Sequence, residues 1–136
     1  MSGFNSIEEA RKYFSGDRFA TENGIELEEL DATHAKCTLK LTPRHRNALG
    51  GVMGGAIFTL ADFAFAALSN DSGRMSVAQQ VSINFLNAVK GDTLIAVATY
   101  RKDGRNSNVV NVDVSDSAGR DIAEFTGLGF KLPGPK

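Results

Sequence analysis

One carboxylate stands alone in the most apolar part of the chain. Across residues 47–70 the only charged side chain is Asp62, and no Lys or Arg lies three or four residues from it, the spacing at which helical side chains meet. An unpartnered carboxylate among apolar residues is energetically costly or has a raised pKa. Asp62 is therefore expected either to serve chemistry or to be structural, at a wet helix edge or bonded to a sheet amide. We favour chemistry.

Two glycines, Gly54 and Gly55, stand at the start of this apolar segment. The first backbone N–H groups of a helix have no partner within it, and they lie at the positive end of a macrodipole equivalent to about half a charge. Glycines leave these groups accessible, which is typical of a site that stabilises an oxyanion. The alternative is that the glycines only permit close packing of the helix start against a sheet.

The residues that follow predict a long helix that is apolar on all sides. At about 3.6 residues per turn, one face carries Ile57, Leu60, Ala61, Ala64, Ala67 and Leu68, and the opposite face carries Phe58, Phe63 and Ala66. Such a helix must be enclosed by the rest of the fold.

Alternating apolar and polar residues predict strands on either side of this helix. The pattern runs through Ile25 and Leu27, and through residues 35–41, 75–86, 93–101, 106–116 and 120–131. Short glycine-containing turns indicate that the last four strands are antiparallel neighbours, and Gly73 is expected in a surface turn before them. Ser6 and Glu9 form a capping-box pattern, which predicts a short first helix ending near residues 15–16 and acting as a lid or brace.

This order of elements is typical of an α+β fold in which one curled antiparallel sheet wraps around a long central helix. The length of 136 residues fits a single domain, 1–136, with an N-terminal helical segment (1–20) and a core (21–136).

Composition argues against several classes of function. The net charge is -1 and no basic stripe is present, so nucleic acid is not an expected partner. The longest apolar stretch, residues 56–68, is well short of the roughly 20 residues that span a membrane. Metal and nucleotide motifs are missing from the sequence, so we expect no metal and no cofactor. The single cysteine, Cys37, is expected to pack in the core, and a cytoplasmic location is expected because no apolar leader occurs in residues 1–19.

A longer motif joins the glycines to the carboxylate. Residues 45–55 read His-Arg-Asn-Ala-Leu-Gly-Gly-Val-Met-Gly-Gly and are followed by Leu60-Ala61-Asp62. This pattern resembles the H-x-N-x-x-G-x-x-H-G-G…L-x-D motif of hotdog-fold acyl-CoA thioesterases, the group that contains the phenylacetate-degradation thioesterase. The resemblance extends over residues 24–131. It implies a hotdog fold and hydrolysis of an acyl-CoA thioester to a free carboxylic acid and CoA.

The resemblance also implies roles for three residues. Asp62 would be the general base or nucleophile, the Gly54 N–H would polarise the thioester carbonyl, and Asn47 would position the water or the carbonyl. Met53 is a departure from the family, since it replaces the usual His in front of the two glycines.

A second departure lies on the strand after the helix, where the family often has Ser or Thr and this chain offers Gln79 and Gln80. By alternation Gln79 shares the apolar side of Val77 and Val81, from which it would hydrogen-bond Asp62; the alternative is a Gln that reaches solvent. The expected substrate contacts are Met53, Gly55, Gln79, Gln80, His45 and Arg105. Arg105, with Arg101 and Lys102 around the same turn, would meet the CoA phosphates, or Arg44 and Arg46 would do so instead, unless these are only solvated surface charges. His45 could also brace its loop.

Gly54 and Asp62 are eight residues apart, which places their backbones about 12 Å apart along a helix. One thioester carbon cannot reach both, so the sequence predicts a homodimer with two shared sites, alone or as a dimer of dimers (a homotetramer). Two other functions stay open at this stage. One is an acyl-thioester hydratase or dehydratase, which needs a His-based acid–base pair, and the other is a non-catalytic acyl-CoA-binding protein.

Overall fold

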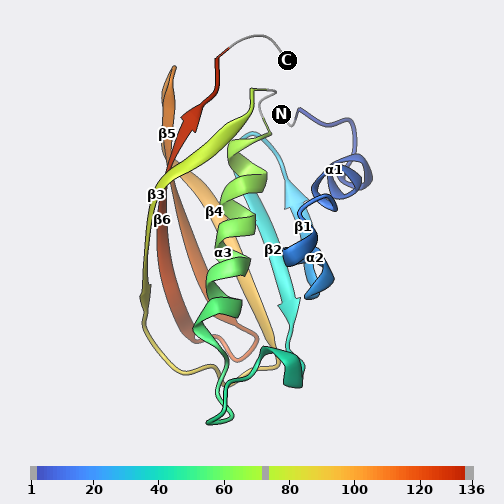
Figure 1. Cartoon of the computed structure of the whole chain (residues 1–136), viewed down its shortest axis with the longest axis vertical. Coiled ribbons are helices and arrows are strands. Elements are labelled where there is room, and N and C mark those ends of the chain that lie inside the picture. Colours follow the sequence, from blue (N-terminus) through green and yellow to red (C-terminus); the bar gives the residue numbers. More distant parts are fainter. Residues whose placement is uncertain (1–2, 72–73, 134–136) are drawn as a thin grey trace.

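A long helix, α3 (Gly54–Ser69), lies in the curve of a six-stranded antiparallel sheet (Figure 1). The computed structural model describes residues 3–71 and 74–133, so the turn predicted at Gly73 lies outside the described residues. The strands are β1 (Ile25–Leu30), β2 (His34–Lys40), β3 (Ser76–Phe85), β4 (Thr93–Asp103), β5 (Ser107–Asp116) and β6 (Asp121–Lys131). The predicted α+β architecture, the hotdog arrangement of a sheet around a central helix, is confirmed.

The order of the strands in the sheet is β1-β2-β4-β5-β6-β3. The prediction of antiparallel neighbours is confirmed for β4 with β5 and for β5 with β6. It is wrong for β3 and β4, because β3 pairs with β6 and β4 pairs with β2. Residues 86–92 are not a tight turn but a connection that crosses below the sheet from one edge to its middle (Figure 1). As a consequence β3 is an edge strand.

Small residues on the inner face of the sheet let α3 approach it closely. Ala35 and Cys37 of β2, Ala96 and Ala98 of β4, and Val110 and Val112 of β5 are all fully buried. Cys37 therefore packs in the core as predicted, and burial raises the pKa of its thiol well above the usual range.

The helix is not enclosed on all sides, which corrects the sequence-based expectation. Phe58, Thr59, Asp62 and Ala66 are only partly buried, and their spacing of about one turn forms a single stripe along α3. The sheet curls around the other sides only, so this stripe of the helix remains accessible.

The N-terminal segment braces one side of α3. Helix α1 (Ile7–Phe14) begins at the predicted cap, where the Glu9 N–H donates to Ser6 Oγ at 3.1 Å. Phe14 is buried and its ring meets that of Phe63 on α3 edge-on, with 6.2 Å between the centroids. Two short elements, α2 (Arg18–Glu22) and the 3-10 helix η1 (Pro43–His45), were not predicted. None of the helices in the described residues is long and apolar enough to cross a membrane.

Candidate active site

The start of α3 offers two free backbone donors. Met53 caps the helix through its carbonyl, which accepts the Ala56 N–H at 3.0 Å and the Ile57 N–H at 3.3 Å. The N–H groups of Gly54 and Gly55 have no hydrogen-bond acceptor among the described residues, and Gly55 is exposed. Two unsatisfied donors at the positive end of a 16-residue helix can hold a developing oxyanion.

Asn47 shapes the loop in front of these donors. Its side-chain oxygen accepts the Leu49 N–H at 3.0 Å and the Gly51 N–H at 3.1 Å, and its own N–H donates to the Gly51 carbonyl at 2.8 Å. Gly50 lies between them with φ +89°, a left-handed conformation that favours glycine. Asn47 thus belongs to the Gly54 half of the site, where it holds the loop that leads into α3.

His45 is buried and joins that loop to the N-terminal segment. Its Nδ1 accepts the Thr42 N–H at 3.0 Å, so Nδ1 carries no proton, and Nε2 therefore donates to the Asn23 carbonyl at 2.7 Å. The His45 carbonyl accepts the Met53 N–H at 2.8 Å. Because both ring nitrogens have partners, the geometry supports the bracing role over a contact with substrate through the ring.

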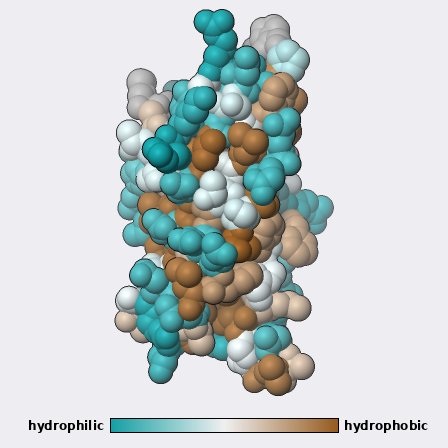
Figure 2. All heavy atoms as spheres, turned by 90° about the vertical axis from the view of Figure 1, so that its left-hand side faces the viewer, coloured by the Kyte–Doolittle hydropathy of each residue, from teal (hydrophilic) through white to brown (hydrophobic). Residues whose placement is uncertain are grey.

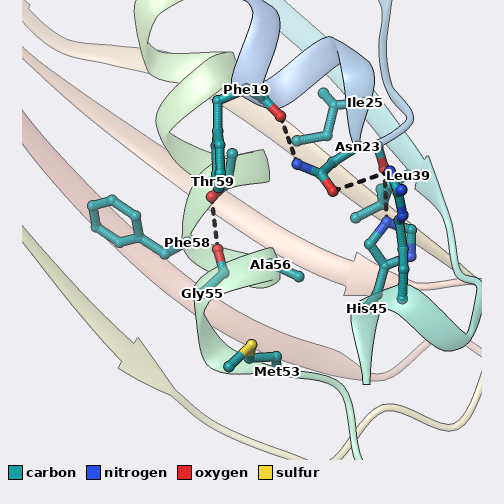
Figure 3. A pocket seen from close by; sticks show the side chains of 11 residues that line it. Phe19, Asn23, Ile25, Leu39, His45, Met53, Gly55, Ala56, Phe58 and Thr59 are labelled. Atoms are coloured by element: carbon teal, nitrogen blue, oxygen red, sulfur yellow. Dashed lines mark hydrogen bonds between the residues drawn. The ribbon is translucent and has the colours of Figure 1, made fainter. Parts of the chain in front are cut away.

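A cavity of about 390 Å³ opens beside the helix start (Figure 3). Met53, Gly55 and His45, three of the expected substrate contacts, line it together. Much of the remaining wall is apolar and comes from Ile25, Leu39, Ala56 and Phe58. The structure thus brings the expected contacts from residues 45–55 to one place.

Asp62 lies two turns further along α3, beside a smaller cavity of about 270 Å³. Within the described part of the chain its carboxylate accepts no hydrogen bond and forms no ion pair; Arg18, which lines the same cavity, pairs with Glu22 at 2.6 Å instead. Burial, and secondarily the nearby Asp17 carboxylate, raise the pKa of Asp62. Of the two structural alternatives, the bond to a sheet amide is absent within the described chain, whereas Asp62 does lie on the accessible edge of α3. It is a partly buried carboxylate suited to accept a proton.

Within one chain Gln79, Gln80 and Arg105 line neither of these cavities. A bulge at Gln79 shifts the register of β3. Side chains before and after the bulge therefore no longer follow one alternation, and residues that would have shared a side of the sheet lie on opposite sides. Val77 consequently faces outward with 45% exposure, and the expectation that Gln79 shares one side with Val77 and Val81 is wrong. Both glutamines are exposed, and the Gln80 amide donates to the Val81 carbonyl.

Arg105 lies in the turn between β4 and β5, beyond the C-terminal end of α3. Its carbonyl accepts a hydrogen bond from Arg74 Nη1 at 3.0 Å. Gly54 is at the other end of the same helix, so a single chain does not place Arg105 next to the free donors.

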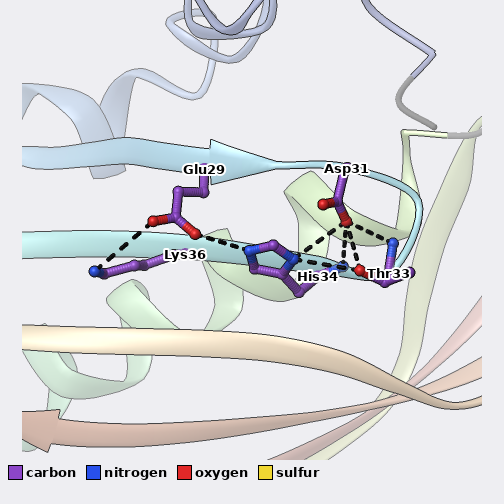
Figure 4. A network of polar contacts seen from close by, with 5 residues as sticks. All are labelled: Glu29, Asp31, Thr33, His34 and Lys36. Carbon is purple, nitrogen blue, oxygen red and sulfur yellow. Dashed lines mark hydrogen bonds and ion pairs between the residues drawn. The ribbon is translucent and has the colours of Figure 1, made fainter.

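The second histidine, His34, belongs to a surface network at the start of β2 and lines neither cavity (Figure 4). Its ring lies between Glu29, at 2.8 Å, and Asp31, at 3.1 Å. The hydrogen bond to Glu29, with the Asp31 charge, raises the pKa of His34. Among the described residues no group of His, Cys, Asp and Glu is arranged to hold a metal ion.

Sequence reasoning missed Phe19, Asn23 and Thr59, which also line the larger cavity. Phe19 belongs to α2, a helix of five residues with no side-chain cap, so no local sequence pattern predicts this helix. Thr59 could have been found, because it lies one helical turn from both Gly55 and Asp62.

Comparison with known proteins extends these observations. Residues 19–127 match a family model described as a domain of unknown function (DUF4442). The chain is 31% identical over 126 residues to the acyl-coenzyme A thioesterase PaaI of Escherichia coli K12, covering 92% of this chain and 90% of that protein. It superposes on the E. coli PaaI structure with a TM-score of 0.82 and 28% identity, covering 96% and 99% of the two chains.

A hypothetical thioesterase of Streptococcus pneumoniae TIGR4, solved with coenzyme A, has a TM-score of 0.83 and 28% identity, covering 92% of this chain and 98% of that one. These matches span nearly the whole chain and include the loop, the glycines and Asp62. The chain belongs to the PaaI-like family of acyl-CoA thioesterases with the hotdog fold.

Proposed function

We propose that this protein is an acyl-CoA thioesterase, which hydrolyses an acyl-CoA to a free carboxylic acid and CoA. The observation that carries the proposal is the unpaired Asp62 carboxylate with its raised pKa, on the same helix as the two free N–H donors. Relatives named acyl-coenzyme A thioesterase support it.

The chemistry follows from these two groups. The Gly54 N–H donates to the thioester carbonyl oxygen and stabilises the negative charge that develops on it. Asp62 takes a proton from a water molecule as the water oxygen bonds to the carbonyl carbon; the C–S bond then breaks, and the thiolate leaves with that proton. In the alternative route the Asp62 carboxylate itself attacks the carbonyl carbon and the C–S bond breaks, which releases the CoA thiolate. Water then hydrolyses the resulting anhydride to the free acid, restores the Asp62 carboxylate and supplies the proton that the thiolate takes up.

The two groups must come from two copies of the chain. Gly54 and Asp62 lie on one helix about 12 Å apart, too far to act on one carbon. We therefore propose a homodimer, in which the Gly54 half of each site comes from one copy and Asp62 from the other. The accessible stripe of α3 that carries Asp62 would face the second copy, and two such dimers could associate as a tetramer.

The edge strand β3 supports the dimer. Its outer edge is unpaired among the described residues, and exposed apolar side chains lie on it and beside it: Met75, Val77, Phe85, Leu86 and Phe130. Figure 2 shows apolar atoms gathered on this side of the molecule. An exposed edge and an apolar patch are features that association of two copies would cover.

In such a dimer Arg105, Gln79 and Gln80 of one copy would reach the substrate site of the other copy. If Asp62 reaches the Gly54 of a second copy, the two α3 helices run in opposite directions, so the C-terminal end of one lies toward the start of the other. Arg105, beyond that C-terminal end, would then meet the CoA phosphates at the other copy's site. Gln79 and Gln80, exposed at the bulge of β3, would contact substrate across the same interface. The free, buried Cys37 supports a cytoplasmic location.

The structure favours hydrolysis over hydration. A hydratase or dehydratase needs a histidine as acid or base, but His45 has both ring nitrogens bonded and His34 lies between two surface carboxylates. A protein that only binds acyl-CoA would have no use for an unpaired, partly buried carboxylate, which destabilises its fold.

Steady-state assays on a panel of acyl-CoAs, with free thiol as the readout, test the proposal. We expect thiol release in proportion to acid formed, and loss of that activity in Asp62→Asn. Tight binding without thiol release would indicate a binding protein. Gain or loss of a double bond at constant thioester would indicate a hydratase or dehydratase.

A further inference from the structure

Phe19 lines two of the cavities that lie beside α3. The cavity at the helix start, about 390 Å³, and the one beside Asp62, about 270 Å³, share two lining residues, Phe19 and Thr59. Figure 3 shows the Phe19 side chain next to Thr59, at one end of the larger cavity. Removal of the Phe19 ring would therefore enlarge the space at this end of the larger cavity.

The position of Phe19 is held by polar contacts rather than by packing. Its side chain is among the exposed ones, with the whole residue 75% exposed. The Phe19 carbonyl accepts the Asn23 side-chain amide at 2.7 Å, and the Asn23 carbonyl accepts His45 Nε2 at 2.7 Å. A large apolar ring left in the open, on a backbone tied to the loop before α3, is suited to contact an apolar ligand.

Apart from the Gly55 N–H, the neutral polar side chains that line the larger cavity are already hydrogen-bonded. His45 has both ring nitrogens bonded, the Thr59 hydroxyl donates to the Gly55 carbonyl at 2.7 Å, and Asn23 bonds Phe19. Arg44 is the one charged residue that lines this cavity, and its Nη1 donates to the Glu22 carbonyl at 3.0 Å. The space is therefore suited to apolar, uncharged groups.

The size and the entrance of this cavity indicate which part of a substrate it takes. A volume of about 390 Å³ is near the lower end of the range of about 300–1,000 Å³ for small-molecule pockets. Gly55 lines this cavity and carries one of the free N–H groups, while Gly54 lines a separate cavity with Phe85 and Leu86, at the edge that the second copy is proposed to cover. A carbonyl bound at the helix start would thus direct its acyl group into this cavity and leave the bulk of CoA outside.

We propose that this cavity receives the acyl group, that the substrates are apolar acyl-CoAs of limited length, and that Phe19 is the residue that sets the limit. The proposal rests on the proposed thioester hydrolysis. It assigns to α2, which no sequence pattern predicted, the role of closing the acyl site.

The test is the dependence of kcat/KM on chain length in a series of saturated linear acyl-CoAs. For the parent protein we expect kcat/KM to rise up to about fourfold with each added methylene, which corresponds to about 0.8 kcal/mol, and to stop rising when the cavity is full. Phe19→Ala should move this maximum to longer chains, and Phe19→Trp should move it to shorter ones. A maximum at the same length in all three proteins would overturn the proposal.

Tyr13→Ala is the matched control, because Tyr13 is an exposed aromatic residue of α1 that lines neither cavity. We expect its maximum to stay at the parental length. Thermal melting verifies that each variant is folded.

Failure of this proposal can be told apart from failure of the proposed hydrolysis. If the parent releases no thiol from any acyl-CoA, the hydrolysis proposal fails, and the same length series is measured as Kd with non-hydrolysable acyl-CoA thioethers. A shift of the preferred length in Phe19→Ala would still support the acyl site. Equal preferences in the parent and Phe19→Ala would overturn it.

Discussion

The two ends of α3 differ in whether side chains supply hydrogen-bond partners to the terminal backbone groups. At the C-terminal end two of the last four carbonyls have side-chain partners: the Ala66 carbonyl accepts the Asn70 N–H at 3.1 Å and the Asn70 side-chain amide at 3.0 Å, and the Leu68 carbonyl accepts the Tyr100 hydroxyl at 2.9 Å. Asn70 also accepts the Ser76 N–H at 2.8 Å. At the N-terminal end the Gly54 and Gly55 N–H groups have no acceptor within the described chain.

This difference shows where the fold is stabilised and where it is prepared for a ligand. Both ends of a helix carry similar partial charges of opposite sign. The Asn70 cap and Tyr100 of β4 contact the negative end, which lies in a buried region where an unpaired carbonyl would destabilise the fold. The positive end faces a cavity and stays bare, so a substrate carbonyl can supply the missing acceptor. Four experiments would break or sharpen this contrast.

The largest expected effect is that of Asp62→Asn. The change is nearly isosteric, so the fold and acyl-CoA affinity should be retained, while turnover falls by about 100-fold or more because the base is lost. Asp113→Asn is a control on the exposed outer side of the sheet. If Asp62→Asn hydrolyses its best thioester within about threefold of the parent, Asp62 is structural.

Gly54→Val should have the next largest effect, a loss in kcat of about 100-fold. A Cβ at Gly54 would lie 3.2 Å from Phe85 Cζ, and the branched side chain would crowd the backbone donor. Gly16→Val is the control, since its Cβ would be 3.4 Å from the Tyr13 carbonyl at the exposed end of α1. Equal losses of activity that follow equal losses of Tm would show that Gly54 serves packing alone.

The pH dependence should report the raised pKa of Asp62. The carboxylate is the active form, so kcat/KM should fall about tenfold per pH unit below that pKa, starting at higher pH than for an ordinary Asp. The same shift means that ionisation of Asp62 destabilises the folded state as pH rises from the unfolded to the folded pKa. Asp62→Asn should therefore have a higher Tm than the parent at neutral pH, and a lower Tm would contradict the assigned environment.

The smallest effects are expected at the C-terminal end of α3 and concern stability only. Asn108 is fully buried and its amide has no partner among the described residues. Asn108→Leu should raise the free energy of unfolding by about 1 kcal/mol or more. Asn70→Leu, which loses bonds to Ala66 and Ser76, should lower it by a similar amount. Urea unfolding measures the free energy of unfolding of both variants. An increase for Asn108→Leu together with a decrease for Asn70→Leu would show that Asn70, not Asn108, stabilises this end of α3.

The parts of the site that depend on local sequence were predictable. The apolar period of α3, its glycine start and the lone charge at Asp62 are contained within residues 47–70, and the structure places them on one helix as expected. The capping box at Ser6 is equally local and is confirmed.

The parts that depend on distant contacts were not predictable. The sequence does not show that β3 leaves β4 for the far edge of β6, because each strand pairs through backbone groups that every residue carries. The bulge at Gln79 changes the alternation without a Gly or Pro to mark it. Phe19 enters the site only because Asn23 and His45 bond the end of α2 to the loop before α3.

The central claim is that each site combines the Gly54 half of one copy with Asp62 of another. Its most direct test mixes two inactive variants, Asp62→Asn and Asn47→Ala, since Asn47 holds the loop of the Gly54 half. In a mixed dimer one site collects both defects and the other has none. Refolding the two in equal amounts yields about half mixed dimers, so roughly a quarter of the parental activity should return. No recovery despite verified subunit exchange would place both residues in one chain's site and contradict the account.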